Sequence, residues 1–346
     1  MHISVGLSAR RLNNISIEMN GEIRDQIFNI KSEKTFNELA IRIFRFQAEQ
    51  NSVYREYISF LGISPGDIEN IYDIPFLPVG FFRNHEVITG NKKPQIVFKS
   101  SGTKAALPGK HYVTDISLYE DSFLNGFRLF YGDPSGYSIL ALLPSYLERE
   151  GSSLIYMMER LILESKNIDS GFYLNNPEEL ILTVNRLKEK NTKNILVGVS
   201  FALLDLAEKF APDLSGITVM ETGGMKGRRK ELVREELHEI LCKKLNINEV
   251  HSEYGMTELL SQAYSKGNGR FHCPPWMKII LRDPNDPLTN YSDTRQTGGI
   301  NIIDLANINS CSFIATSDLG RVYKDSGFEV LGRFDNSDIR GCNLLV

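Results

Sequence analysis

The sequence has few cysteines, and none of them are paired by spacing. Of 346 residues, four are cysteine, at positions 242, 273, 311 and 342, with no CxxC pair among them. This scatter excludes a disulfide framework and a zinc cage of the usual structural kind, and it is typical of reduced thiols. We therefore expect a cytoplasmic protein.

Long apolar runs, repeats and a strong net charge are also lacking. The N-terminal residues hold no signal-peptide core, and no later stretch reaches the uninterrupted apolar length that a bilayer needs. The formal net charge of -4 gives no overall field that would attract nucleic acid or an acidic membrane. With 42% hydrophobic and 24% charged residues, the composition indicates a globular protein with a large core.

Helix and strand patterns alternate through most of the chain. The first helix is expected at residues 35–50, where Thr35-Phe-Asn-Glu38 reads as a capping box. The segment 74–82 is too rich in Pro and Gly for regular structure. Further strands are expected at 95–99, 137–143, 194–199, 217–221 and 250–254, and further helices at 114–130, 153–164, from 177, up to 210, and at 228–245. This alternation predicts an α/β fold with mostly parallel sheets flanked by helices.

The pattern of residue types changes beyond about residue 271. Short candidate strands at 277–282, 299–305, 312–316 and 328–331 are separated by Pro, Asn, Asp and Gly. They predict a small antiparallel, barrel-like subdomain. We expect an α/β core with a helical N-terminal arm at 1–270, the β-rich subdomain at 271–336, and a cysteine-bearing tail at 337–346.

Small hydroxyl residues follow the strand predicted at 95–99, in the sequence Phe98-Lys-Ser-Ser-Gly-Thr-Lys104. Backbone N–H groups around Gly102 and the charge of Lys104 could wrap a phosphate. Three hydroxyls would add to this, those of Ser100, Ser101 and Thr103. Ordinary turns use the same residue types, so this motif alone is weak.

A glycine pair with basic neighbours follows the strand predicted at 217–221. Gly223 and Gly224 would let a flat ligand lie against the backbone. Next to them are the cations Lys226, Arg228, Arg229 and Lys230. Positive charge is unfavourable at a helix N-terminus, where anions bind well, so the pattern favours an anion site over a merely solvated cluster.

The sequence His251-Ser-Glu-Tyr-Gly-Met-Thr-Glu258 offers several groups suited to a nucleotide. Tyr254 could stack on a base, and Gly255 would permit close approach. Thr257 could bond a phosphate, and Glu258 could hold Mg²⁺, which prefers carboxylate and phosphate oxygens. The plainer alternative is a strand-to-helix turn capped by the threonine.

A carboxylate and an arginine stand out in the β-rich region. Asp318 lies in Thr316-Ser-Asp-Leu-Gly-Arg321 and could accept both hydroxyls of a ribose. Arg333 lies in Gly332-Arg-Phe-Asp335 and could contact the same sugar or a phosphate. Taken singly, each could equally be a turn or surface residue.

In this order, the four motifs resemble those of the adenylate-forming superfamily of acyl- and aryl-CoA synthetases, over roughly residues 70 to 341. The resemblance implies the N-terminal core fold of that superfamily. It also implies a reaction of a carboxylic acid with ATP and Mg²⁺ that gives acyl-AMP and pyrophosphate. Ser100 to Thr103 would form the phosphate loop, Gly223 and Gly224 the adenine-facing turn, and Asp318 and Arg333 the ribose contacts.

Two departures from the superfamily pattern stand out. The phosphate loop lacks the usual Thr-Gly-x-Pro-Lys continuation, which leaves open whether Lys104 or Lys110 serves it. Relatives also continue past the last Arg-Gly into a mobile lid that carries the adenylation lysine. Here a short tail follows, so we expect the core without its lid.

A closer resemblance is to the acyl-protein synthetases of bacterial luminescence fatty acid reductase complexes. It is carried by Phe76-Leu-Pro-Val-Gly-Phe-Phe-Arg83 and by Arg340-Gly-Cys-Asn-Leu-Leu-Val346. It implies a fatty acid as substrate, Cys342 as the acyl acceptor and an acyl reductase as protein partner. A thiolate is a good nucleophile toward an acyl-adenylate, although Cys342 could instead be a small buried residue.

Two other functions stay open. One is a lid-less acyl- or aryl-CoA ligase, and the other is a degenerate nucleotide-binding interaction protein. The presence of Thr257, Glu258, Asp318 and Arg333 argues against degeneration. The base that would activate Cys342 is unassigned, with His238, His251 and His272 as candidates, His238 being the most consistent with a structural role. Tyr146 and Phe201 could wall an acyl pocket or simply pack in the core, and His272-Cys273 lacks the further ligands of a metal site.

Overall fold

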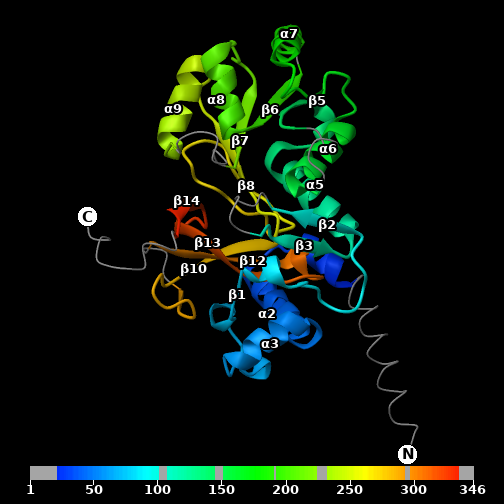
Figure 1. The fold of residues 1–346 in the computed structure, drawn as a ribbon, viewed down its shortest axis with the longest axis vertical. Helices are drawn as coiled ribbons and strands as arrows, with labels where there is room; N and C mark the ends of the chain where they lie inside the picture. The colour runs from blue at the N-terminus through cyan, green and yellow to red at the C-terminus, as the bar shows by residue number, and fades with distance from the viewer. Residues whose placement is uncertain are drawn as a thin grey trace, which may run out of the picture.

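The computed structural model describes residues 22–100, 107–144, 151–190, 192–223, 232–292 and 297–334. Figure 1 shows a helix-flanked sheet in the upper part of the molecule and a second sheet crossing below it, with α2 and α3 underneath. The last residues of β8 lie where the two parts meet. No helix among the described residues is long and apolar enough to cross a membrane.

The upper sheet is built from strands in the order β5-β4-β6-β7-β8-β9. Its strands are β4 (Tyr137–Leu142), β5 (Gly171–Phe172), β6 (Lys193–Val199), β7 (Thr218–Thr222), β8 (His251–Tyr254) and β9 (Ala263–Ser265). All neighbouring pairs are parallel except β8 and β9. β4 is buried along its whole length, as expected of a parallel strand covered on both faces. The predicted mostly parallel sheet is confirmed.

Helices cover both faces of this sheet (Figure 1). They are α5 (Ile116–Tyr131), α6 (Ser153–Ser165), α7 (Pro177–Lys188), α8 (Ser200–Lys209) and α9 (Arg234–Leu245). The Asp115 side chain caps α5 by accepting from the backbone N–H of Ser117. The prediction for α9 was wrong at its start, because Val233 is extended and the helix begins at Arg234. Lys226, Arg228, Arg229 and Lys230 lie outside the described residues.

The lower sheet runs in the order β1-β13-β12-β10-β11, with β14 on β13. Its strands are β10 (Met277–Arg282), β11 (Asn290–Tyr291), β12 (Thr297–Asp304), β13 (Phe313–Val322) and β14 (Phe328–Arg333), together with β1 (Leu77–Pro78). The predicted antiparallel β-rich region is therefore confirmed. One strand differs from expectation: β1 comes from the segment expected to be irregular, and it pairs parallel to β13.

Two N-terminal helices, α2 (Glu33–Gln50) and α3 (Ser52–Phe60), pack against the lower sheet. The helix start predicted at Thr35 was late, because Ser32 is the cap and its side chain accepts from the Thr35 backbone N–H. Phe44 contacts Phe313 of β13 edge-on at 5.9 Å between ring centroids. Buried Gln47 donates to the backbone carbonyl of Ile308 at 2.9 Å. The helices thus cover one face of the lower sheet.

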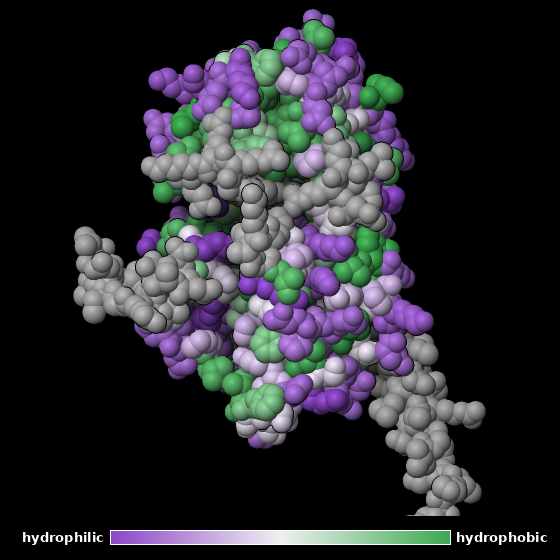
Figure 2. Space-filling view, viewed as in Figure 1, coloured by the Kyte–Doolittle hydropathy of each residue, from purple (hydrophilic) through white to green (hydrophobic). Residues whose placement is uncertain are grey.

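A hairpin of β2 (Ile96–Lys99) and β3 (Lys110–Val113) forms a separate two-stranded sheet. The strand predicted at 95–99 is present, and within the described residues β3 is the one strand that it pairs with. Short helices complete the fold: η1 (Pro65–Asp67), η2 (Ile71–Asp73), α4 (Phe81–Asn84), η3 (Pro134–Gly136) and η4 (Leu305–Asn307). On the face seen in Figure 2, hydrophilic side chains predominate at the top, and hydrophobic ones gather in smaller groups.

Candidate functional site

Residues from both sheets meet at the carboxyl ends of the parallel strands. β7 ends at Thr222 and β8 ends at Tyr254, and parallel strands place all their carboxyl ends at one edge. Across from this edge, the Tyr254 hydroxyl donates to Asp318 Oδ2 of β13 at 2.8 Å. A residue of the third motif and one of the fourth, 64 positions apart, are therefore in direct contact.

Asp318 and Arg333 are cross-strand neighbours on β13 and β14. The Arg333 Nε donates to Asp318 Oδ1 at 3.1 Å. The aspartate side chain is 11% exposed, whereas the arginine side chain is 74% exposed. We call Tyr254, Asp318 and Arg333 the Asp318 cluster. Strand pairing fixes its two charged members side by side, with the cation toward solvent.

The Tyr254 ring is packed into an aromatic group below the site. Its centroid lies 5.8 Å from that of Phe271 and 5.5 Å from that of Phe328. Burial, reinforced by the nearby Asp318 carboxylate, raises the pKa of Tyr254 well above its usual value. The phenol therefore stays protonated and remains a hydrogen-bond donor.

Glu258 lies against the hairpin that carries the first motif. A Cβ atom added to Gly109 would overlap Glu258 Oε1, and it would lie 3.4 Å from Ser100 Oγ. Ser100 Oγ also accepts from the Gly109 backbone N–H at 2.8 Å, and the Ser100 N–H donates to the Gly109 carbonyl at 2.9 Å. We call Ser100, Gly109 and Glu258 the Glu258 cluster. It joins one end of the first motif to the last residue of the third.

The Glu258 carboxyl is buried, with 7% of the residue exposed. Burial raises its pKa, and Asp318 acts in the same direction, while Arg83 and Arg333 oppose the shift. A carboxylate destabilised in this way gains from a further cation, and its oxygens suit Mg²⁺. No group of three or more acidic, His or Cys side chains in the described part of the chain could hold a metal. Glu258 fits a metal that takes its other ligands from a bound phosphate and water.

The turn that carries Thr257 and Glu258 is held by two side chains that the sequence analysis did not identify. His111 Nδ1 donates to the Thr257 carbonyl at 2.9 Å, and Asn307 Nδ2 donates to the Glu258 carbonyl at 2.8 Å. Burial lowers the pKa of His111 to about 4, so the ring is neutral near pH 7. Neither residue belongs to a motif, and each acts on a backbone atom far away in the sequence.

The second motif begins beside the same edge. Gly223, directly after β7, has φ of +54°, a conformation that glycine adopts without strain. Glu221, in β7, is buried. Its burial opposes ionisation, but His238 and Arg234 outweigh that and lower its pKa. The Arg234 Nε lies 3.5 Å from Glu221 Oε1. The sequence analysis missed this pair, since it placed Arg234 well inside the helix.

Several predicted residues lie outside the described part of the chain. They are Ser101, Gly102, Thr103, Lys104, Tyr146, Gly224 and Cys342. Gly255 is described and exposed next to Tyr254, and Lys110 is exposed at the start of β3. Among the histidines proposed as bases, His251 contacts the Tyr131 hydroxyl at 3.1 Å and Glu249 at 3.3 Å. These contacts give His251 a structural role.

Comparison with known proteins identifies the fold. No protein-family model and no curated protein sequence matches the chain. Among solved structures, ATP-bound MatB from Rhodopseudomonas palustris is similar, with a TM-score of 0.52 and 15% identity over 68% of this chain and 47% of that one. A long-chain-fatty-acid-CoA ligase, FadD1 from Archaeoglobus fulgidus, is also similar, with a TM-score of 0.51, 15% identity and coverage of 68% and 51%.

The chain thus spans about half the length of each of these two structures. At this level of identity the likeness concerns the fold alone. The chain therefore shares the α/β fold of the part of each of these two structures that it matches.

Proposed function

We propose that the protein activates a carboxylic acid, specifically a fatty acid, by adenylation with ATP and Mg²⁺. The proposal rests on one observation: the Asp318 cluster and the Glu258 cluster lie close together at the carboxyl ends of the parallel strands. Tyr254 bonds Asp318 at 2.8 Å, and Glu258 lies against Gly109 and Ser100. Ligands bind at such edges in open α/β sheets, and this fold is found in ATP-bound MatB.

The proposed roles follow the chemistry of each group. Tyr254 would contact the adenine, with Gly255, Gly223 and Gly224 giving the base access to the backbone. Asp318 would accept the ribose hydroxyls, and Arg333, which is largely exposed, would contact the sugar or a phosphate. The phosphates would be bound by Thr257 and by the residues Ser100, Ser101, Gly102, Thr103 and Lys104. Glu258 would hold Mg²⁺, which would neutralise phosphate charge.

In the first step, a carboxylate oxygen of the acid forms a bond to the α-phosphorus of ATP. The bond from that phosphorus to the bridging oxygen of the β-phosphate breaks, and pyrophosphate leaves with its negative charge. Little covalent chemistry is required of the protein, so positioning and charge neutralisation supply most of the rate. These two tasks match what the Asp318 and Glu258 clusters offer.

In the second step, we propose that Cys342 takes the acyl group. Its thiolate sulfur would form a bond to the acyl carbonyl carbon, the bond from that carbon to the AMP oxygen would break, and AMP would leave. The thioester would then pass to an acyl reductase partner. This step rests on the sequence resemblance, because Cys342 lies outside the described residues.

The test of adenylation is a pyrophosphate-release assay with ATP, Mg²⁺ and acids of graded chain length. We expect release that requires both an acid and Mg²⁺ and that is largest for one range of chain lengths. ATP binding without pyrophosphate release for every acid would instead indicate a nucleotide-binding interaction protein.

The test of acyl transfer is mass spectrometry of the intact protein after the same incubation. We expect one acyl group on Cys342, none in the Cys342→Ser variant, and normal labelling in Cys242→Ser, which removes another thiol that is partly exposed. An unmodified Cys342 with acyl-AMP released would refute self-acylation. AMP formation that requires CoA and survives Cys342→Ser would indicate an acyl-CoA ligase.

A further inference from the structure

The backbone after Glu258 follows an irregular path, yet it is deeply buried. Residues 255–262 belong to no helix or strand, and Glu258, Leu260 and Ser261 are each less than a tenth exposed. A buried turn outside regular structure must find partners for its N–H groups elsewhere. Those partners decide where the Glu258 side chain points.

Asp304 supplies the partners for two successive N–H groups of this turn. It lies at the end of β12, and its Oδ2 accepts from the backbone N–H of Leu260 at 2.8 Å and of Ser261 at 3.0 Å. Its Oδ1 accepts from the Ser261 hydroxyl at 2.6 Å and from the Ala306 N–H at 3.2 Å. One side chain thus joins β12 and η4 to the segment just after Glu258.

The connection extends beyond Asp304. Because the Ser261 hydroxyl donates to Asp304, its oxygen can accept from Trp276 Nε1 at 3.1 Å and from the Ser122 hydroxyl at 3.0 Å. Ser122 lies in α5, and Trp276 directly precedes β10. The turn is therefore linked to elements of both the upper and the lower part of the molecule.

The chemistry of Asp304 shows that its function here is to accept hydrogen bonds. It is fully buried, and in the described part of the chain it forms no ion pair. A carboxylate is the one short side chain that accepts at every position, whereas an asparagine would direct N–H groups at other donors. A buried charge without a cation is costly, so the arrangement favours a role in holding the turn over one in general stability.

A second attachment acts on the same turn from the same region. Asn307, three residues after Asp304, donates to the Glu258 carbonyl at 2.8 Å and to the Cys311 carbonyl at 2.9 Å. The turn is therefore fixed at the Glu258 carbonyl by Asn307 and at the N–H groups of Leu260 and Ser261 by Asp304. On its other side, the Glu258 carboxylate lies so close to Gly109 that a Cβ atom there would overlap it.

We propose that Asp304 is a positioning residue for Glu258, holding the turn at 258–261 so that the glutamate carboxylate faces Gly109 and Ser100, beside which the metal-bound phosphates would lie. The proposal deepens the proposed function and rests on it. Because Asp304 is fully buried, it would touch neither the nucleotide nor the metal. It acts by setting the orientation of the residue that would bind the metal.

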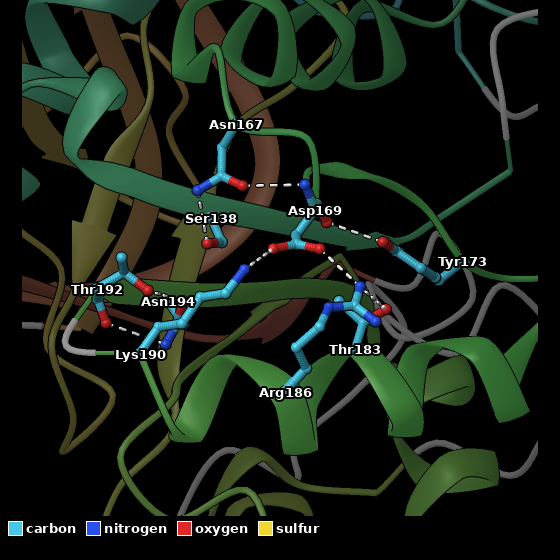
Figure 3. Close-up of polar contacts among 9 residues, drawn as sticks. All are labelled: Ser138, Asn167, Asp169, Tyr173, Thr183, Arg186, Lys190, Thr192 and Asn194. Atoms are coloured by element: carbon cyan, nitrogen blue, oxygen red, sulfur yellow. Dashed lines mark hydrogen bonds and ion pairs between the residues drawn. The ribbon is translucent and has the colours of Figure 1, made fainter.

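The experiment compares Asp304→Asn with Asp169→Asn in the full chain. Asp169 is also a buried aspartate, but it is bound by Arg186 and Lys190 at 2.6 and 2.9 Å (Figure 3). This network involves Ser138 and Asn194, at the opposite edge of the sheet, where β4 and β6 begin. Both variants should unfold at lower temperature, but only Asp304→Asn should alter the use of Mg²⁺.

The readouts are the Mg²⁺ dependence of pyrophosphate release and calorimetry of ATP binding with and without Mg²⁺. We expect Asp304→Asn to raise the half-saturating Mg²⁺ concentration by about 10- to 100-fold, the effect typical of losing an outer partner of a metal ligand. Metal-free ATP binding should be unchanged. In a Glu258→Gln background, Asp304→Asn should add no further change.

An unchanged Mg²⁺ requirement in Asp304→Asn, or a shift that persists in the Glu258→Gln background, would overturn the proposal. If Asp304→Asn does not fold, Ser261→Ala removes one of the same hydrogen bonds, and it should raise the Mg²⁺ requirement by a smaller factor and speed amide exchange at Leu260. No such shift in Ser261→Ala would then refute the proposal. Wild-type protein that binds Mg·ATP yet releases no pyrophosphate would refute the proposed function alone, because calorimetry would still test Asp304. Wild-type protein that binds no Mg·ATP would refute both.

Discussion

The two clusters of the candidate site are held in place by different means. Asp318 and Arg333 stand on paired strands, so a ladder of backbone hydrogen bonds fixes their separation. Glu258 stands on an irregular turn that depends on single side-chain contacts from His111, Asn307 and Asp304. In a ladder, many backbone hydrogen bonds together fix the positions of the two side chains. In the turn, each of the bound backbone groups depends on a single side chain. We therefore expect the Glu258 cluster to be more sensitive to single changes than the Asp318 cluster.

Of the substitutions that test this comparison, Glu258→Gln should have the largest effect on activity. The amide keeps the shape of the side chain but removes the charge that would hold Mg²⁺. We expect pyrophosphate release to fall by about 100- to 1000-fold, as on losing one electrostatic stabiliser. Asp318→Asn should mainly raise the KM for ATP. Steady-state kinetics of both variants will decide, and a larger loss of kcat in Asp318→Asn would reverse the comparison.

A methyl group at Gly109 should have the next largest effect. A Cβ there would overlap Glu258 Oε1, so the carboxylate must move. We expect Gly109→Ala to lower pyrophosphate release by roughly 10- to 100-fold and to raise the Mg²⁺ requirement, by analogy with other displaced metal ligands. Gly66→Ala is the matched control, because nothing lies within 4 Å of a Cβ at that position. Equal activity of the two variants would show that the contact is unimportant.

His111 should make stability depend on pH. Its folded pKa of about 4 lies below the usual 6.5, so between these values the unfolded chain takes up a proton that the folded protein does not. Stability should therefore fall as the pH drops through this window, by about 3 kcal/mol in total. Asp304 should contribute a pH dependence of stability with the opposite sign. Burial raises its pKa to about 6, so between pH 6 and 3.8 it is protonated in the folded protein and ionised in the unfolded chain, and stability rises as the pH falls through this window.

The His111→Asn variant separates these opposed contributions. It removes the titrating ring, so its stability should rise relative to wild type on going from pH 7 to pH 4.5. Urea unfolding at the two pH values measures the difference. An identical pH dependence in both proteins would show that the buried ring does not titrate as its environment implies.

The smallest effect should come from Tyr254→Phe. It removes the hydrogen bond to Asp318, which should cost about 1 kcal/mol of stability and raise the KM for ATP severalfold. Tyr137→Phe is the control, since the Tyr137 hydroxyl donates to the Tyr131 carbonyl at 2.7 Å and Tyr137 begins β4, at the opposite end of the parallel strands. It should cost similar stability without changing the KM. A shared change in KM would point to a general effect of unfolding.

Strand patterns and motifs contributed differently to the candidate site. Tyr254 ends the strand predicted at 250–254, whereas Asp318 and Arg333 lie on β13 and β14 beyond the strands predicted at 312–316 and 328–331, so the motifs and not the strand pattern singled them out. His111, Asn307 and Asp304 could not be found in this way. His111 contacts a backbone atom 146 positions away, and such a contact leaves no trace in composition or periodicity.

Errors at helix starts have a related origin. Ser32 and Thr35 both suit a cap, and the difference was decided by the Ser32 side chain reaching the Thr35 N–H. The start of α9 was misplaced because apolar spacing continues through Leu232 and Val233, although the backbone there is not helical. Periodicity locates the buried face of a helix better than its first residue.

The two-residue strand β1 has a consequence for how the chain folds during synthesis. Leu77 pairs with Ile314, so β1 stays unpaired until β13 has been made. The packing of α2 is delayed as well, because Gln47 of α2 hydrogen-bonds to the carbonyl of Ile308, 261 positions later in the chain. The apolar face of α2 thus stays exposed until residue 308 and β13 have been synthesised. Nascent chains of this protein should therefore depend on chaperones that shield apolar helices until β13 has emerged.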